Sequence, residues 1–297
     1  MKKIKTEIDK VLEQLVADRR EEVIRLQTSQ ASRLRELESR GQTRLSQLQD
    51  TLPGELAEAF KAQERSHEEQ AEETRQLTTS LSKELSATSS SMEQTTLHPG
   101  VGAALNASAA AVGWLTPYYG TLHGSNGTVY WQGYNPGTID ASVYANGAGS
   151  GLFGTGAGSF TVYMDWWFTY RAPENRNYSH SVSVPFNGFY IVRADDGFWD
   201  SKEAHARIDL SAVGYQYNYK AVGTANVLDV RDDNINVNDR FDGWRNIYYS
   251  DLLGADQAYL RVTASLYVYA RGGGSTAQLN FSDGSANYLG VPWVYVN

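Results

Sequence analysis

An eleven-residue repeat of apolar residues near the start of the chain constrains the fold more than any other feature. One row of the repeat contains Met1, Leu12, Val23, Leu34, Leu45 and Leu56, and a second contains Ile4, Leu15, Leu26, Leu37, Leu48 and Ala59. Eleven residues complete three turns of an α-helix at about 3.67 residues per turn, so both rows stay on one face of a nearly straight helix. The sequence therefore predicts a long helix whose apolar stripe needs a partner.

The third position of the repeat decides what kind of partner is expected. Ile8, Arg19, Gln30, Gly41 and Leu52 occupy it, so this row is polar through its middle and the apolar stripe is narrow. A narrow stripe favours pairing with another helix over docking on a broad core. We therefore expect a coiled-coil-like stalk that makes a homo-oligomer. The predicted oligomerisation residues are Leu12, Leu15, Val23, Leu26, Leu34, Leu37, Leu45 and Leu48.

The pair Pro53-Gly54 is the one clear break in this helical part. Proline is tolerated in the first turn of a helix, so the pair is compatible with a kinked rod or with a helical hairpin that turns there. The eleven-residue phase continues at Leu56 and Ala59, which favours the rod without excluding the hairpin.

Composition divides the chain near residue 96. Before this point there are one aromatic residue and two glycines, and after it there are 34 aromatic residues and 25 glycines. We predict an oligomerisation stalk over residues 1–96, a Gly/Ala-rich linker over residues 97–126 and a β domain over residues 127–297. The roughly 200 residues after the boundary are enough for one β domain with a continuous core.

The second part has the alternation of antiparallel strands. In residues 160–169, Phe160, Val162, Met164, Trp166 and Phe168 point one way, and residues 258–271 repeat the pattern from Ala258 to Ala270. Period two with one apolar face predicts strands that are buried on that face. The fold class is therefore a multidomain α + β chain: a helical stalk followed by an antiparallel β-sandwich or jelly-roll-like head.

Turn-forming dipeptides separate the predicted strands. They are Asn126-Gly127, Asn187-Gly188, Asp196-Gly197, Asp242-Gly243 and Asp283-Gly284. We expect Asp283-Gly284 to close a hairpin between residues 277–281 and 286–289.

Charge and motifs exclude several classes of function. The net charge of −8 divides into −3 and −5 on the two parts, and no basic run with interleaved aromatic residues is present, so nucleic acid is not an expected partner. The chain has no cysteine, and its five histidines lack metal-ligand spacing. Glu203 lies close to His205, but no catalytic motif accompanies the pair, so we predict a non-enzymatic protein without cofactor or metal. Residues 229–242 are rich in Asp and Asn, which leaves a calcium site there as an open alternative.

Aromatic residues on the polar faces of the strands are the best clue to a ligand. They alternate or cluster with carboxylates and arginines, a mixture that suits the C–H faces and hydroxyls of sugars and equally suits protein interfaces. The predicted ligand-binding residues are Tyr163, Asp165, Trp167, Asp195, Asp196, Trp199, Tyr259, Arg261 and Tyr267. Packing between subunits is the alternative role for the same residues.

These observations predict a self-assembling, adhesin-like oligomer whose β-sandwich head binds a glycan or a protein surface, or packs into a larger assembly. The alternative is a membrane-active or pore-forming toxin that uses the helical segment or the Gly/Ala-rich stretches over residues 100–115 and 147–158. Neither a Sec-type signal nor about 20 consecutive apolar residues is present in the sequence. We expect cytoplasmic synthesis, and export would need a non-classical route.

Overall fold

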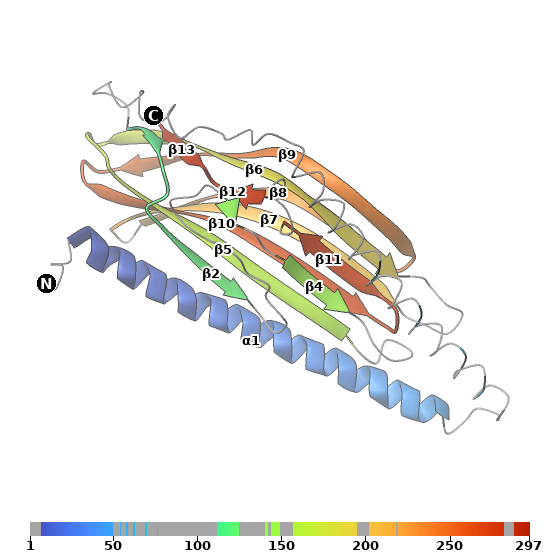
Figure 1. Ribbon diagram of the computed structural model, residues 1–297. Coiled ribbons are helices and arrows are strands. Elements are labelled where there is room, and N and C mark those ends of the chain that lie inside the picture. Colours follow the sequence, from blue (N-terminus) through green and yellow to red (C-terminus); the bar gives the residue numbers. More distant parts are fainter. Residues whose placement is uncertain are drawn as a thin grey trace, which may run out of the picture.

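A computed structural model describes residues 7–49, 112–124, 140–141, 144–148, 157–194, 202–217, 219–281 and 288–297, with the isolated helical positions 54, 58, 62, 69 and 76. These residues form one long helix and two antiparallel sheets that pack on each other (Figure 1). The predicted break at 53–54 lies in a range of which only isolated positions are described, so rod and hairpin both stay predictions.

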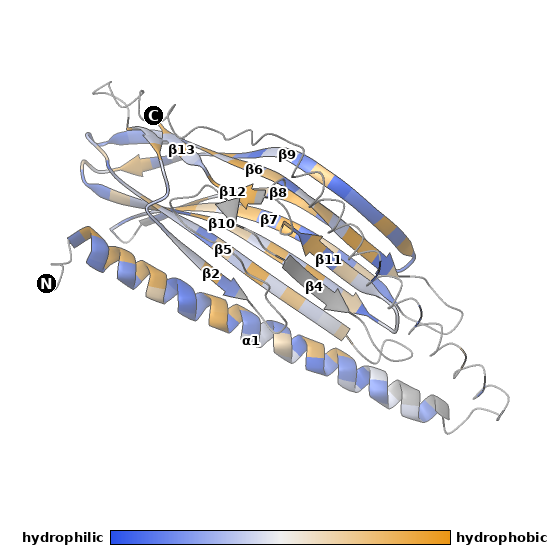
Figure 2. Ribbon diagram, viewed as in Figure 1, coloured by the Kyte–Doolittle hydropathy of each residue, from blue (hydrophilic) through white to orange (hydrophobic). Residues whose placement is uncertain are grey.

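Helix α1 (Glu7–Gln49) confirms the long helix that the repeat predicts. Its first turn carries Glu7 and Asp9, whose charges suit the positive end of the helix dipole. Figure 2 shows apolar and hydrophilic residues alternating along its length. The coiled-coil stalk is not confirmed, because α1 lies along one sheet of the head and packs against it.

The sheet under α1, named sheet B, has five strands in the order β2-β5-β10-β7-β8. The strands are β2 (Tyr119–Gly124), β5 (Ala157–Arg171), β7 (Glu203–Gln216), β8 (Tyr219–Asp232) and β10 (Gln257–Arg271). Strands β5 and β10 confirm the two strongest predicted strands, and their register places Phe168 opposite Leu260 on the inner face. All pairs in this sheet are antiparallel, as the alternation predicts.

The second sheet, named sheet A, is organised around strand β6 (Arg176–Ala194). Strand β9 (Ile235–Leu253) pairs with β6 along its whole length. On the other side, β13 (Trp293–Val296), β12 (Tyr288–Gly290) and β11 (Thr276–Asn280) follow one another along β6. Strands β1 (Gly113–Leu115), β3 (Asp140–Ala141) and β4 (Tyr144–Ala148) pair in turn with β13, β12 and β11.

The main hydrophobic core lies between the two sheets. Sheet B contributes the predicted inner rows of β5 and β10, and sheet A contributes residues such as Val182, Val184 and Phe186 of β6. These side chains are almost fully buried, and no residue of α1 belongs to this cluster. The described part of the head therefore builds its core from its own strands.

Two of the predicted turns lie inside strands instead. Asn187-Gly188 is in the middle of β6, and Asp242-Gly243 is in the middle of β9. At Gly188 a Cβ atom would lie 2.6 Å from the backbone oxygen of Asn280, so glycine is needed there for close packing of strands. At Gly243 the φ angle of +145° is one that glycine adopts without a steric penalty.

The predicted hairpin at Asp283-Gly284 is also wrong in its pairing. Strands β11 and β12 do not pair with each other, because each pairs with a different stretch of β6. Long β6 accepts three short strands in succession, which local turn signals cannot reveal. The dipeptide itself, with Asn126-Gly127 and Asp196-Gly197, lies outside the described residues.

The described strands begin earlier than the composition suggests. Strands β1 and β2 lie within residues 97–126, the range predicted as a linker. Strand β2 pairs with β5 at one edge of sheet B, and β1 pairs with β13 in sheet A. The stretch is rich in small residues, yet residues 113–124 belong to the sandwich.

Candidate functional site

Helix α1 covers the outer face of sheet B through a hydrophobic cluster. Leu12 packs with Trp167, Val213, Tyr215 and Tyr259, with Ile8, Leu15 and Val16 at the border. The Trp167 side chain is 0% exposed, and its ring stacks on that of Tyr215 with 6.0 Å between centroids. Aromatic surface that would otherwise face water is thereby buried, which stabilises the docking of the helix.

A buried ion pair lies at the centre of this contact. Asp165 of β5 is fully buried, and the guanidinium of Arg19 donates to its two oxygens at 3.1 and 3.4 Å. The Thr263 hydroxyl donates to the same carboxylate at 2.5 Å, and the Thr121 hydroxyl donates at 3.4 Å. Donors from α1, β10 and β2 therefore converge on one carboxylate, as a buried charge requires.

The environment of Arg19 keeps it charged. Burial opposes ionisation of the guanidinium, but the charges and hydrogen bonds of Asp165 and Glu22 together outweigh burial and raise the pKa of Arg19. The guanidinium also lies over the ring of Tyr163, 5.2 Å from its centroid. Breaking such a pair by removing one partner typically costs about 3 to 5 kcal/mol, because the other charge stays buried.

Further polar contacts join the helix to the head on either side of Arg19. Glu22 of α1 accepts from Arg261 at 3.4 Å, and Arg19 and Arg261 together lower the pKa of Glu22 although burial opposes them. Gln30 accepts a hydrogen bond from Thr161 at 3.0 Å. Arg19 and Gln30, the polar residues of the third row, therefore face the sheet and bind Asp165 and Thr161 there, and Glu22 adds a contact from outside this row.

The predicted ligand-binding residues fall into three groups. Tyr163, Asp165, Trp167, Tyr259 and Arg261 are at most 8% exposed beneath α1. In the structure this face is not open, because the helix occupies it. A ligand could reach these residues only if α1 moved away, and their role in binding stays a prediction. Tyr267 is half-buried beside His205, and Asp195, Asp196 and Trp199 lie outside the described residues.

The predicted oligomerisation residues are divided in a similar way. Leu12 and Val23 are buried, so they are not available for a second helix. Leu15, Leu34 and Leu37 are half-buried, whereas Leu26 is 41% exposed. The side chains of Leu45 and Leu48 lie outside the described residues. The predicted seam is thus partly used within the chain, because the helix turns one row towards sheet B.

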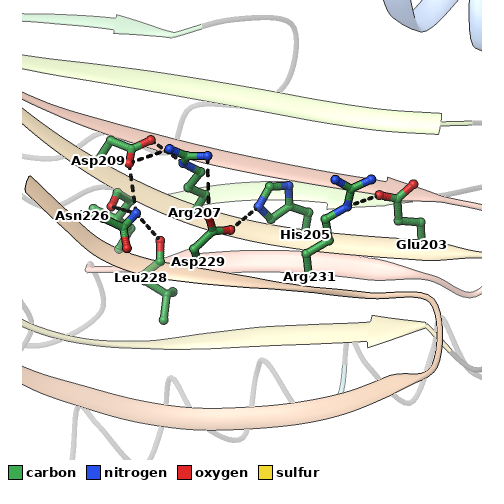
Figure 3. Close-up of polar contacts among 9 residues, drawn as sticks. Glu203, His205, Arg207, Asp209, Asn226, Leu228, Asp229 and Arg231 are labelled. Carbon is green, nitrogen blue, oxygen red and sulfur yellow. Dashed lines mark hydrogen bonds and ion pairs between the residues drawn. The ribbon is translucent and has the colours of Figure 1, made fainter.

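A ladder of charged residues occupies the outer face of β7 and β8 (Figure 3). Glu203 binds Arg231 at 2.5 Å, His205 binds Asp229 at 2.7 Å, and Arg207 binds Asp209 at 2.5 Å. His205 therefore pairs with Asp229 on the neighbouring strand, and not with Glu203 as its nearness in sequence suggests. Each of these side chains already has a polar partner within the ladder, so the ladder is weak evidence for a ligand site.

The outer face of sheet A carries a different surface. Cross-strand partners share a face, and one row runs Trp114, Tyr295, Ser181 and Tyr248 across β1, β13, β6 and β9. The next rows contain Trp293, Ser183 and Asn246, and then Pro185 and Trp244. We call Trp114, Trp244, Tyr248, Trp293 and Tyr295 the aromatic platform.

The aromatic platform combines exposed rings with polar groups. Tyr248 is 70% exposed and Trp244 is 44% exposed, although both are large apolar side chains. Between the rings, the Ser183 hydroxyl donates to the Asn246 side-chain oxygen at 2.8 Å. Trp114 and Trp293 meet edge to face at 4.1 Å between centroids, which holds these rings in place. Neighbouring strands lie about 4.8 Å apart, so the platform spans about 14 Å from β1 to β9.

The alternation of residues 244–252 indicates part of this platform, and the predicted ligand-binding residues do not include it. Residues 244, 246, 248, 250 and 252 alternate as Trp, Asn, Tyr, Ser and Leu, between residues that the structure places on the other face. Such alternation indicates a strand, but either face could be the inner one. Only the pairing of β9 with β6 shows that Tyr248 faces outward while Ile247 joins the core.

Two further properties of the described residues bear on the predicted calcium site and on the membrane-active alternative. No group of three or more His, Cys, Asp or Glu side chains in these ranges could hold a metal ion. None of the described helices is long and apolar enough to cross a membrane. Most of residues 100–115 and 147–158 lies outside the described ranges, so the membrane-active alternative stays a prediction.

Comparison with known proteins identifies no family for this chain. No family model matches it, and no curated protein matches its sequence. Among solved structures, it is similar to an Arthrobacter globiformis isomalto-dextranase complexed with panose, at 11% identity and a TM-score of 0.22, over 60% of this chain and 23% of that enzyme. A CBM35 module from Cellvibrio japonicus gives 10% identity and a TM-score of 0.21, over 60% of this chain and 93% of the module. At these scores the likeness establishes neither a shared family nor a shared ligand.

Proposed function

We propose that this protein is a non-enzymatic glycan-binding protein and that its binding surface is the aromatic platform of sheet A. The observation that carries the proposal is the exposure of Trp244 and Tyr248 beside the polar pair Ser183 and Asn246. Sugar rings stack their C–H faces on aromatic rings while their hydroxyls take hydrogen bonds from polar neighbours. Exposed aromatic groups with fixed polar partners supply both kinds of contact.

The shape of the surface favours an extended glycan over a single sugar. The platform lies on the open face of a sheet, and its rings come from three strands, β1, β13 and β9. Trp244 and Tyr248 are four residues apart on β9, which corresponds to about 13 Å along a strand. A chain of several sugar units can contact both rings at once, whereas a monosaccharide cannot.

Binding of the full chain to a panel of soluble polysaccharides in affinity gels tests this proposal. We expect one class of extended glycan to retard the protein, and Trp244→Ala and Tyr248→Ala each to weaken retention at least about 10-fold, as loss of a central aromatic contact does. Tyr217→Ala is the matched control, since Tyr217 is 77% exposed in the turn after β7, away from the platform. Equal retention of all variants, or no retention by any glycan, would overturn the proposal.

A second candidate function is self-association through α1. Ile24 is 52% exposed and Leu26 is 41% exposed on the docked helix, so apolar surface stays uncovered. If two copies pair through this surface, two platforms could engage one glycan chain and weak contacts would gain from multivalency. Light scattering of Leu26→Lys tests this: we expect the mass of an oligomer to fall to that of one chain. A wild-type mass of one chain at all concentrations would exclude it.

A further inference from the structure

A buried polar cluster lies directly behind the aromatic platform. His180 of β6 alternates with Ser179 and Ser181, and Tyr249 of β9 alternates with Tyr248 and Ser250. His180 and Tyr249 are cross-strand partners, and the register also makes Tyr248 the partner of Ser181 on the opposite face. The same short stretch of backbone therefore carries the platform outward and the cluster inward.

The rings of the cluster are held in one arrangement. The Tyr170 hydroxyl of β5 and Nε2 of His180 are 2.6 Å apart, a hydrogen bond between the two sheets. The imidazole stacks on the Tyr249 ring at 4.4 Å between centroids with 6° between planes. Tyr249 fits because β7 and β8 carry glycines opposite it: a Cβ on Gly214 would lie 3.2 Å from the Tyr249 hydroxyl, and one on Gly223 would lie 3.1 Å from the ring.

The cluster tolerates a neutral imidazole and disfavours a charged one. His180 is 2% exposed, and its Nδ1 atom has no hydrogen-bond partner of good geometry. Burial lowers the pKa of His180 from 6.5 to about 4, although the backbone of Tyr178 and Tyr249 offsets part of the effect. In the imidazolium both ring nitrogens are donors, so Tyr170 could only accept the bond and its own hydrogen would need another acceptor.

None of the other titratable groups of the cluster compensates the charge of a protonated His180 without a free-energy cost of its own. They are Tyr170 from β5, Tyr178 from β6 and Tyr249 and Asp251 from β9, and Asp251 is the acidic one among them. Asp251 is 3% exposed, its Oδ1 atom has no hydrogen-bond partner, and burial raises its pKa. Asp251 therefore affects the packed cluster in the opposite direction from His180. Its neutral form stabilises the cluster in acid, and its ionisation destabilises the cluster as pH rises.

We propose that proton uptake by His180 in acid loosens the pairing of β6 with β9 behind the aromatic platform and thereby releases the bound glycan. The release rests on the proposed function, whereas the loosening rests on the buried cluster alone. If the opened state restores the ordinary pKa of 6.5, the opening equilibrium rises about 20-fold between pH 7 and pH 5 and about 100-fold between pH 7 and pH 4.

Hydrogen exchange of the full chain, read by mass spectrometry from pH 7 to pH 4 and corrected for intrinsic rates, tests the loosening. In the wild type, the corrected exchange rate of peptides covering residues 177–184 and 246–253 should rise about 100-fold between pH 7 and pH 4, as the opening equilibrium does. They should show less than a threefold rise in His180→Gln, which keeps a partner for Tyr170 but has no proton to gain in this range. Peptides from residues 203–210 of β7 serve as the internal control. An equal rise in wild type and variant would overturn the proposal.

Two further readouts keep the outcome decisive. If His180→Gln does not fold, an NMR titration of the wild type replaces it: we expect the His180 ring to titrate near pH 4 together with the amides of Ser181 and Tyr248. Titration near pH 6.5, or without these amides, would overturn the proposal. Glycan retention in the same buffers tests the release. Opening without any glycan binding at pH 7 would contradict the proposed function alone, and opening with pH-independent retention would contradict the coupling.

Discussion

The two outer faces of the sandwich have similar chemistry and different neighbours. Sheet B presents Trp167 and Tyr215 beside Asp165, and sheet A presents Trp244 and Tyr248 beside Asn246. Trp167 is 0% exposed because α1 covers it, whereas Tyr248 is 70% exposed. Aromatic residues that alternate with polar ones therefore do not by themselves identify a binding face. What distinguishes the faces is whether another element of the chain supplies matching charges and apolar groups.

The largest expected difference between the faces is in stability. Trp167→Ala should lower the free energy of unfolding by about 3 to 5 kcal/mol, as Trp166→Ala in the main core should, because both leave cavities in buried clusters. Urea unfolding followed by far-UV circular dichroism measures both variants. If Trp167→Ala costs less than about 1 kcal/mol, the contact between α1 and sheet B is not the one described.

The pH dependence of stability probes the layer beneath the open face. The pKa of His180 is lower in the folded state than in the unfolded state. Its contribution to the free energy of unfolding is therefore fully present above about pH 6.5 and is lost as pH falls towards 4. The expected loss is about 3 kcal/mol over this range. Urea unfolding at several pH values should show it in the wild type and not in His180→Gln. Parallel curves for the two proteins would contradict the burial of a neutral imidazole.

The buried ion pair makes docking of α1 on sheet B specific. Asp165→Asn keeps one acceptor oxygen but replaces the other with a donor and removes the charge that faces Arg19, so we expect a loss of about 2 to 3 kcal/mol. Asp209→Asn is the matched control, since its pair with Arg207 is on the same face but at the surface, with side chains 40% and 44% exposed, where such pairs contribute about 0 to 1 kcal/mol. Protease cleavage within residues 7–49 should increase for Asp165→Asn only. Equal sensitivity of both variants would show that the pair does not hold the helix.

The smallest expected effect on stability is on the open face. Trp244→Ala should change the free energy of unfolding by less than about 0.5 kcal/mol, because the side chain is already half in water. Trp244→Ala should also lose glycan retention, so on sheet A binding falls while stability is kept. On sheet B, Trp167→Ala should lower stability and leave glycan retention unchanged. A large loss of stability in Trp244→Ala would indicate that another surface covers the platform.

Much of the strand pattern could be predicted because it is a local property. Alternation in residues 160–169 and 258–271 requires one buried face, and the structure buries the expected rows. The turn-forming dipeptides predicted the strand ends less well, because glycine also occurs inside strands where two backbones pack closely. Gly188 lies in the middle of β6 beside Asn280, a contact between residues 92 positions apart that no local pattern reveals.

The aromatic platform could not be predicted for a related reason. Its five rings come from β1, β9 and β13, which only the order of strands in sheet A brings together. Each strand alone presents two faces, and the residues on either face include aromatic groups. Which face is open depends on where α1 docks, and α1 packs on sheet B although the next described strand of the chain, β1, belongs to sheet A.

By itself the sequence determined a long straight helix with Arg19 and Gln30 in its third row, since the period of the repeat is a property of the helix alone. It also determined antiparallel strands with defined inner rows. The partner of the helix was decided only by the tertiary structure: Asp165 lies 146 positions from Arg19, and Thr161 lies 131 positions from Gln30. In the sequence, a polar row within an apolar stripe indicates only a weak interface between helices. Its charges and amides stabilise a contact where specific partners meet them, and those partners are known only from the tertiary structure.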